Sequence, residues 1–408
     1  MSLRTQLFLF FTAVTCMAAA GGVHDSIFNN FLSDTFHLTA EQRGWLELPR
    51  ELPGFLTALM SGVLCFLAVT RVAVVAALLF GLGLTGIALW GNSFSPMLVM
   101  MIVASAGMHL LQPAGTSIVL GLCDETNRGR RMGQAGAVGT AGTVLGTGLI
   151  WLFFDRAAPR YAAGFFLAAT LGVVAAAVYA VMHMPHLHGP RQRLVVRQRF
   201  SLYYILELVA GARKQVFLTF GPWVLIKVYG AAATSIAGLL LTAAVLGIAF
   251  QPLAGLAIDR LGERRVMIFD GLGLAFVCIG YGYAIRWLGT PERALPIAGA
   301  CYIADNLLFT LGSARSVYLS RLTKSPEELN ATLALGVSVN HVASMTIPAA
   351  AGAIWVGFGY ERVFAAAAVL AVGSALLALW VPARQKRSLT TAPTLPEPAQ
   401  AEALAEKT

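Results

Sequence analysis

Long apolar stretches separated by short polar segments run through almost the whole chain. A helix needs about 20 apolar residues to cross the hydrocarbon core of a bilayer. The pattern therefore predicts an all-α integral membrane fold with twelve transmembrane helices. Their expected ranges are 5–33, 40–69, 72–91, 95–121, 132–153, 161–183, 202–228, 233–257, 266–287, 292–319, 326–355 and 361–382.

The longest internal polar segment divides the predicted spans six and six. We therefore expect an N-terminal six-helix bundle over 1–183, a basic linker over 184–200 and a C-terminal six-helix bundle over 201–387. The segment 388–408 is rich in Pro, Ala, Thr and Glu, which is typical of a disordered tail. Two halves joined by a linker is the plan of transporters built from repeats.

Several predicted spans begin with helix-capping residues. Thr39 with Gln42, and Ser325 with Glu328, have the spacing of a capping box, and Thr290 precedes a proline. The first span resembles a secretory signal at its start, but its apolar run continues to Leu32 without a cleavage site, so we expect an uncleaved helix.

Composition supports a membrane protein and excludes several other classes. Of the 408 residues, 57% are hydrophobic and only 12% are charged, with a mean hydropathy of +0.71; soluble proteins carry about 25% charged residues. The net charge of +9 comes from short loops between apolar spans, which argues against nucleic acid as a partner. Lys and Arg are concentrated in alternate loops, which predicts an inner (plasma) membrane protein with both termini in the cytoplasm.

No motif for bound cofactors, metals or enzymatic chemistry is found. The five cysteines form no Cys-x-x-Cys or Cys/His cluster, so neither a disulfide framework nor a zinc site is expected. The chain has no phosphate loop, no His-Glu-x-x-His and no Gly-x-Ser-x-Gly. We therefore expect a non-enzymatic protein without cofactor, whose partner is the lipid bilayer.

Two adjacent cations interrupt the seventh predicted span. Arg213 lies about 18 Å from the start of that helix, near the middle of the bilayer. A charge at this depth needs a wet cavity or a carboxylate. Since neighbouring residues on a helix point about 100° apart, we expect one of Arg213 and Lys214 to pair with Asp305 while the other stays free for an anionic ligand. A structural salt bridge with a snorkelling lysine is the alternative.

Other polar side chains fall at similar depths on the fourth, seventh, tenth and eleventh spans. Midplane positions at the repeat interface are where such transporters bind substrate. Each histidine among them is either a proton relay or a hydrogen-bonding strut. The predicted substrate-binding residues are His109, Gln112, Arg213, Lys214, Gln215, Asp305, Asn306, Asn340 and His341.

The second span carries three charges on one face, Glu47, Arg50 and Glu51. Asp25, late in the first span, should reach a similar height, so we predict an Asp25–Arg50 pair. This pair would leave Glu47 or Glu51 less compensated and able to carry a coupling proton. The alternative is a satisfied charge network that only locks the two helices. Glu207 and Arg315, nearer the cytoplasmic ends, are interpreted as interface anchors.

The loop after the eighth span reads Gly-Leu-Ala-Ile-Asp-Arg-Leu-Gly-Glu-Arg-Arg and resembles the Gly-x-x-x-Asp-Arg-x-Gly-x-Arg-Arg loop of the major facilitator superfamily. The resemblance, to twelve-span members of the bacterial type, implies two pseudo-symmetric halves with the first, fourth, seventh and tenth helices around a cavity. The corresponding N-terminal loop keeps only Arg71. The resemblance implies a gating latch formed by Gly255, Asp259, Arg260, Gly262, Arg264 and Arg265.

These features together predict a secondary active transporter that works by alternating access as a monomer, coupled to protons and moving a small anionic organic solute. A drug or metabolite efflux antiporter is an alternative, although the fifth span lacks the proline of drug antiporters between Gly133 and Trp151. A lipid flippase or a non-transporting sensor on the same scaffold is a further alternative. Gly142 and Gly146 in that span predict close helix packing.

Overall fold

The computed structural model describes residues 1–64, 66–123, 128–155, 157–184 and 197–383. Within these ranges the chain is helical with turns and loops, and contains no β-strand. The predicted tail 388–408 and all but the ends of the predicted linker 184–200 lie outside the described residues.

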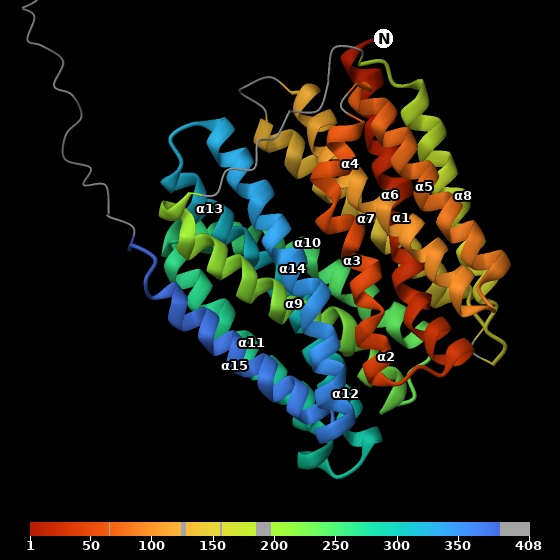
Figure 1. Ribbon diagram of the computed structural model, residues 1–408, viewed down its shortest axis with the longest axis vertical. Coiled ribbons are helices and arrows are strands. Elements are labelled where there is room, and N and C mark those ends of the chain that lie inside the picture. The colour runs from red at the N-terminus through yellow and green to blue at the C-terminus, as the bar shows by residue number, and fades with distance from the viewer. Residues whose placement is uncertain (65, 124–127, 156, 185–196, 384–408) are drawn as a thin grey trace, which may run out of the picture.

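The helices form two groups that lie side by side (Figure 1). The N-terminal half consists of α1 (Leu3–Phe36), α2 (Ala40–Trp45), α3 (Glu47–Phe55), α4 (Thr57–Val63), α5 (Val69–Trp90), α6 (Phe94–Gly121), α7 (Arg128–Phe153) and α8 (Tyr161–Val181). The C-terminal half consists of η1 (Gln198–Phe200), α9 (Ser201–Lys227), α10 (Ala233–Leu261), α11 (Glu263–Leu288), α12 (Pro291–Leu308), η2 (Phe309–Gly312), α13 (Ser313–Leu322), α14 (Pro326–Phe358) and α15 (Tyr360–Ala378).

Among the described residues, ten helical stretches are long and apolar enough to cross a membrane: α1, α5 to α8, α10, α11, α12 with α13, α14 and α15. The chain is therefore a multi-pass membrane protein. The two other predicted spans are α9 and the run from α2 to α4. They do not meet this test, because α9 is too polar for its 27 residues and the α2–α4 run is divided into short helices.

Two spans predicted to be continuous helices are broken. Over 40–69, Pro49 and Pro53 have no backbone N–H, so the carbonyls four residues earlier lose their helical partners and the helix divides. Over 292–319, the 3₁₀ segment η2 separates α12 from α13. There the hydroxyls of Thr310 and Ser313 donate to backbone carbonyls three residues earlier, in competition with regular helical bonding.

All three predicted helix starts agree with the structure, although one of the two predicted capping boxes is incomplete. Thr39 and Gln42 form a complete capping box, and the Thr290 hydroxyl accepts a bond from Arg293 N. Ser325 caps α14 through Glu328 N, but the carboxylate of Glu328 does not complete the box. Instead it accepts a hydrogen bond from the backbone N of Lys324 and pairs with Arg197 and Arg199 at the end of the predicted linker.

Three apolar cores show where the two halves meet. One core contains residues of both halves, among them Phe31, Leu46 and Phe220. The other two cores each belong to one half, and they lie at the end of the bundle where α1 and α9 begin. The halves are therefore packed together at one end and separated at the end where the chain starts.

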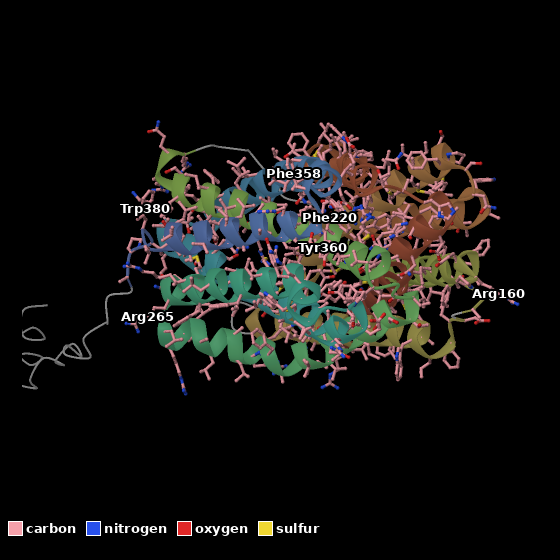
Figure 2. All side chains as sticks on the ribbon, turned by 90° about the horizontal axis from the view of Figure 1, so that it is seen from below. Arg160, Phe220, Arg265, Phe358, Tyr360 and Trp380 are labelled. Atoms are coloured by element: carbon pink, nitrogen blue, oxygen red, sulfur yellow. The ribbon has the colours of Figure 1, made fainter. Side chains whose placement is uncertain are left out.

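Side chains outside the cores fit a lipid environment. In Figure 2, Phe220 and Tyr360 belong to the shared core, whereas Phe358 and Trp380 are exposed, at 76% and 74% of their surface. Large exposed apolar side chains occur on most of the long helices. In water such a surface would aggregate, whereas in a bilayer it faces acyl chains.

Glycines allow close helix contact at several places, of which two bear on how the helices are grouped. As predicted, Gly142 and Gly146 pack α7 on α1, where a Cβ on Gly146 would lie 2.0 Å from the carbonyl oxygen of Ala19. The second contact joins the two halves, because a Cβ on Gly44 of α2 would lie 2.2 Å from the carbonyl oxygen of Pro348 in α14. Gly44 therefore belongs to the contact that closes one end of the bundle.

Candidate functional site

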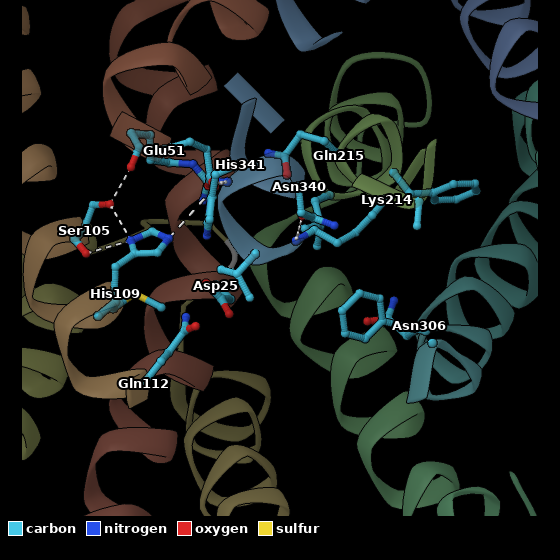
Figure 3. Close-up of a pocket in the computed structure, with 18 of the residues that line it drawn as sticks. Asp25, Glu51, Ser105, His109, Gln112, Lys214, Gln215, Asn306, Asn340 and His341 are labelled. Carbon is cyan, nitrogen blue, oxygen red and sulfur yellow. Dashed lines mark hydrogen bonds and ion pairs between the residues drawn. The ribbon is translucent and has the colours of Figure 1, made fainter. Parts of the chain in front are cut away.

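A cavity of about 610 Å³ lies between the two halves. Helices α1, α3 and α6 of one half and α9, α12 and α14 of the other contribute most of its polar lining, part of which is shown in Figure 3. The wall also includes Tyr203, which belongs to the core of the separated end, so the cavity extends toward that end. All nine residues predicted to bind substrate line it: His109, Gln112, Arg213, Lys214, Gln215, Asp305, Asn306, Asn340 and His341.

The carboxylate of Glu47 is fully buried behind the cavity wall and binds three side chains. Arg43 Nη1 lies 2.5 Å from Oε1, while Arg50 Nη2 at 2.6 Å and Gln215 Nε2 at 2.8 Å bind Oε2. Arg43, inside the predicted second span, is 1% exposed and also donates to Asn29 Oδ1 at 3.1 Å. Glu47 thus connects α2, α3 and α9 and has no free place for a ligand.

The predicted Asp25–Arg50 ion pair is wrong. Arg50 pairs with Glu47 and Glu51 of its own helix, with Nη2–O distances of 2.6 and 3.0 Å. Glu47 and Glu51 lie three residues before and one residue after Arg50. Their carboxylates are therefore closer to its guanidinium than the carboxylate of Asp25 on α1. Asp25 instead contacts His24 Nδ1 at 2.9 Å, and its side chain is 60% exposed toward the cavity.

Glu51 makes a contact between the two halves. Its Oε2 lies 3.0 Å from His341 Nδ1 of α14 and 3.9 Å from His109 Nε2 of α6 (Figure 3). His109 Nδ1 lies 2.9 Å from the carbonyl oxygen of Ser105, which only accepts, so Nδ1 carries a proton and Nε2 faces Glu51. A Cβ on Gly54 would lie 2.5 Å from His341 and 2.7 Å from His109, so a larger residue at position 54 would displace the two imidazoles.

This cluster also has the composition of a metal site. The candidate ligand atoms of Glu51, His109 and His341 all lie within 4.8 Å of one another. However, the guanidinium of Arg50 lies 3.0 Å from the other oxygen of Glu51. A cation beside the same carboxylate repels a divalent ion, so the arrangement favours a proton shared between a carboxylate and an imidazole.

The two cations of α9 have different partners, as the sequence predicted. Arg213 Nη1 lies 2.8 Å from Asp305 Oδ1, and both side chains are largely buried. Lys214 has no carboxylate within ion-pair distance among the described residues. Its Nζ lies 3.4 Å from Asn340 Oδ1 and 6.0 Å from the centre of the Phe309 ring.

Glu207 and Arg315 are not interface anchors. Arg315 Nε donates to Glu207 Oε1 at 2.9 Å, their side chains are 16% and 13% exposed, and both line the cavity. The sequence did indicate that Glu207 faces the cavity. It lies seven residues, or two helical turns, before Lys214 and therefore on the same face of the helix. For Arg315 no comparable signal existed, since the break at η2 changes the face that it presents.

The predicted gating loop joins α10 to α11 at the separated end. Gly262 has φ +84°, a left-handed conformation that favours glycine. The sequence did not indicate that Glu263 beside it is buried and binds Arg321 Nη1 of α13 at 2.5 Å. Gly255, Asp259 and Arg260 lie in the last two turns of α10, and Arg264 and Arg265 lie in the first turn of α11.

A second cavity of about 450 Å³ adjoins the first within the N-terminal half. It lies between α1, α6 and α7, and its wall is mostly apolar. Phe80, Met108 and Gln112 line both cavities. An apolar side pocket therefore adjoins the polar central one.

The fold matches solved transporters of several kinds. The nucleoside transporter NupG superimposes with a TM-score of 0.71 at 13% identity, over 93% of this chain and 98% of that one. The D-xylose-proton symporter gives 0.68 at 15% identity, over 93% and 97%. A POT family transporter in complex with 5-aminolevulinic acid gives 0.73 at 11% identity, over 91% and 95%. At these identities the likeness shows the fold alone.

No curated protein sequence matches the chain. The family model of the Major Facilitator Superfamily matches residues 10–291 and 203–405, which together cover nearly the whole sequence. With this match, the two helical halves and the cavity between them, the chain belongs to the Major Facilitator Superfamily, a superfamily of transporters and not of enzymes.

Proposed function

We propose that this protein is a secondary active transporter that couples the movement of a small organic solute with an anionic group to the movement of protons. The hydrogen bond between Glu51 of one half and His341 of the other carries this proposal. It places a titratable pair across the interface that must rearrange if the cavity is to open alternately to the two sides of the membrane.

The proposed coupling depends on the number of protons held by the Glu51–His341 pair. With one proton, the pair is an ion pair or a neutral hydrogen-bonded pair, and either joins the halves. A second proton leaves a neutral carboxyl beside an imidazolium and removes the charge attraction between the halves. The guanidinium of Arg50 also faces this carboxylate, 3.0 Å from Glu51 Oε1, and His109 Nε2 lies 3.9 Å from Oε2. Glu47 is saturated by its partners and serves as a structural group.

The environment of Lys214 is the reason for proposing that the solute carries an anionic group. It is the cation of the cavity wall that has no carboxylate partner among the described residues, whereas Arg43, Arg50, Arg213 and Arg315 each have one. A lysine ammonium desolvated in a cavity binds carboxylate or phosphate through charge-assisted hydrogen bonds.

The proposed topology has twelve spans, with α9 and the α2–α4 run crossing the bilayer beside the ten apolar stretches. The separated end carries the loops that are rich in Lys and Arg, so we place it in the cytoplasm of a cell with the protein in the plasma (inner) membrane. The conformation described is then open to the cytoplasm. The protein acts as a monomer, and the loop from Gly255 to Arg265 latches neighbouring helix ends.

Glu51→Gln is expected to abolish proton-driven accumulation while retaining exchange of solute across the membrane. The amide keeps the shape and a hydrogen bond to His341 but cannot take up a proton. Proteoliposomes with an acidic exterior are screened with labelled carboxylates, amino acids and dipeptides. The variant is then compared with wild type in gradient-driven uptake and in exchange of labelled for unlabelled solute.

Glu292→Gln, at an exposed carboxylate on α12, is the matched control and should accumulate solute like wild type. If Glu51→Gln still accumulates solute and remains sensitive to a protonophore, Glu51 does not carry the proton. If no solute in the screen responds to the gradient in wild type, proton coupling itself is contradicted.

A lipid flippase is the second candidate, and the adjoining apolar cavity favours it. A polar cavity beside an apolar pocket could hold a headgroup and part of an acyl chain. Transfer of a fluorescent phospholipid between leaflets of the same proteoliposomes, without response to any water-soluble solute, would support this function over the first.

A further inference from the structure

Ion pairs account for most of the charge around the central cavity. Arg43 and Arg50 share Glu47, Arg50 also binds Glu51, Arg213 binds Asp305, and Arg315 binds Glu207. In the part of the chain that the structure describes, two charges of the wall remain without a permanently ionised partner of opposite sign. They are Lys214 and Asp25.

These two charges belong to different halves of the protein. Asp25 is on α1, and its side chain is 60% exposed although most of the residues around it on that helix are buried. Lys214 is on α9. Figure 3 shows Asp25 on the side of the cavity where His109 and Gln112 lie, whereas Lys214 extends from the side of Asn306.

The contact of Asp25 does not supply a fixed positive charge. Its partner His24 can be neutral or protonated. The imidazole also stacks on Phe28, with 4.7 Å between ring centroids and 25° between planes, so His24 is held at the wall and Asp25 presents its carboxylate to the cavity. A carboxylate in a membrane-embedded cavity is costly unless water or a bound cation compensates for it.

We propose that the central cavity binds a zwitterion, with the cationic group of the ligand at Asp25 and its carboxylate at Lys214. This inference rests on the proposed transport function and narrows its substrate class from anions to zwitterions of the amino acid or short peptide type. Between the two charges the wall offers the uncharged amides of Gln112, Asn306 and Asn340. The cavity volume falls within the range of about 300–1,000 Å³ that is typical of small-ligand sites.

Binding of one zwitterion would also contact both halves of the protein. Asp25 belongs to the N-terminal half and Lys214 to the C-terminal half, so a ligand that reaches both connects the two bundles. A ligand with only one of the two charges leaves the other charge unpaired in the cavity. The structure thus predicts selection against simple anions as well as against simple cations.

Matched ligands that differ in one charge at a time test this proposal. One series is alanylalanine, its N-acetyl form, its amide and the form with both changes; a second series uses leucine in the same way. Binding to the purified full-length protein is followed by the rise in melting temperature with ligand concentration. We expect the zwitterion of at least one series to bind about tenfold or more tightly than its N-acetyl and amide forms.

The two sides of the site are separated by substitution. In Asp25→Asn the zwitterion should bind no better than its N-acetyl form, and in Lys214→Met no better than its amide. Asp34→Asn on α1 and Lys227→Met on α9 are matched controls, because Asp34 bonds with Tyr161 and Lys227 lies 5.1 Å from the Trp223 ring, both outside the cavity. Both controls should keep the wild-type preference.

Failure of this inference differs from failure of the transport proposal. If the N-acetyl form binds as tightly as the zwitterion and Asp25→Asn changes nothing, the zwitterion site is overturned while anion transport through Lys214 stands. If Lys214→Met leaves the binding of every ligand unchanged, the anionic part of the proposed function is overturned as well. Absence of binding by both zwitterions overturns the assignment to amino acids and dipeptides.

Discussion

Gly44→Ala is expected to shift the protein out of the conformation in which the α2 end of the bundle is closed. A Cβ there would lie 2.2 Å from Pro348 O and 2.8 Å from Pro348 C, both backbone atoms that cannot rotate away. Overpacking of this kind costs about 1–3 kcal/mol. Since the contact joins the two halves, the cost falls on the closed form alone and changes the population ratio about fivefold to a hundredfold.

Spin labels across this contact measure the shift. Gln42→Cys on α2 and Gly357→Cys on α14 place labels at exposed positions on the two halves, in a background whose native cysteines are replaced by serine. In Gly44→Ala the distribution of label distances should move to longer values. An unchanged distribution would mean that α2 and α14 do not separate during the transport cycle.

Gly146→Ala is the matched control for packing within one half. Its Cβ would lie 2.0 Å from Ala19 O, an even tighter contact, but α7 and α1 belong to the same half. The substitution should lower the melting temperature without moving the distance distribution. Gly148→Ala on the same helix has no neighbouring atom within 4 Å and should change neither quantity.

Much of the cavity wall could be predicted from the sequence because polar residues are conspicuous in apolar spans. Lys214, Asn306 and Asn340 stand out only because the bilayer makes an unneeded polar group costly. The depth along each helix then follows from the rise per residue, without knowledge of any tertiary contact. Arg213 and Asp305 could be paired for the same reason.

The partners of the other charges depend on geometry that spacing alone does not give. Arg50 could pair with carboxylates on its own helix or with Asp25 on α1. The depth of a residue along its helix is known from sequence only to a few ångströms, which is too coarse to identify the partner. Arg43 lies inside the predicted second span, but residue spacing does not indicate that its guanidinium is buried against Glu47. Pro49 and Pro53 are the sequence signal for the division of this span, because each removes a backbone donor from the helix.

Among exchanges of a membrane-embedded carboxylate for its amide, Glu47→Gln should lower the stability of the folded protein the most. Arg43 would lose the negative charge at 2.5 Å and keep only neutral partners, namely amide oxygens at positions 47 and 29 and the Trp223 ring, 5.9 Å away. Arg50 would still have Glu51. Removing one partner of a buried pair costs about 3–5 kcal/mol, because the other charge stays buried without compensation.

Thermal unfolding of the purified protein in detergent measures this loss, with Glu41→Gln as the matched control. Glu41 is exposed in the first turn of α2, so its substitution should stay within about 0.5 kcal/mol of wild type. The double variant Arg43→Met, Glu47→Gln should recover much of the stability, since no unpaired cation remains. If the double variant is as unstable as Glu47→Gln alone, the loss has another cause than the charge of Arg43.

The same variant separates structure from coupling within one charge network. Glu47 has Arg43, Arg50 and Gln215 around it and does not line the cavity, whereas Glu51 lines the cavity and contacts the opposite half. At a temperature where it remains folded, Glu47→Gln should therefore still accumulate solute in response to a proton gradient. Glu51→Gln should show the opposite combination, a nearly normal melting temperature without gradient-driven accumulation.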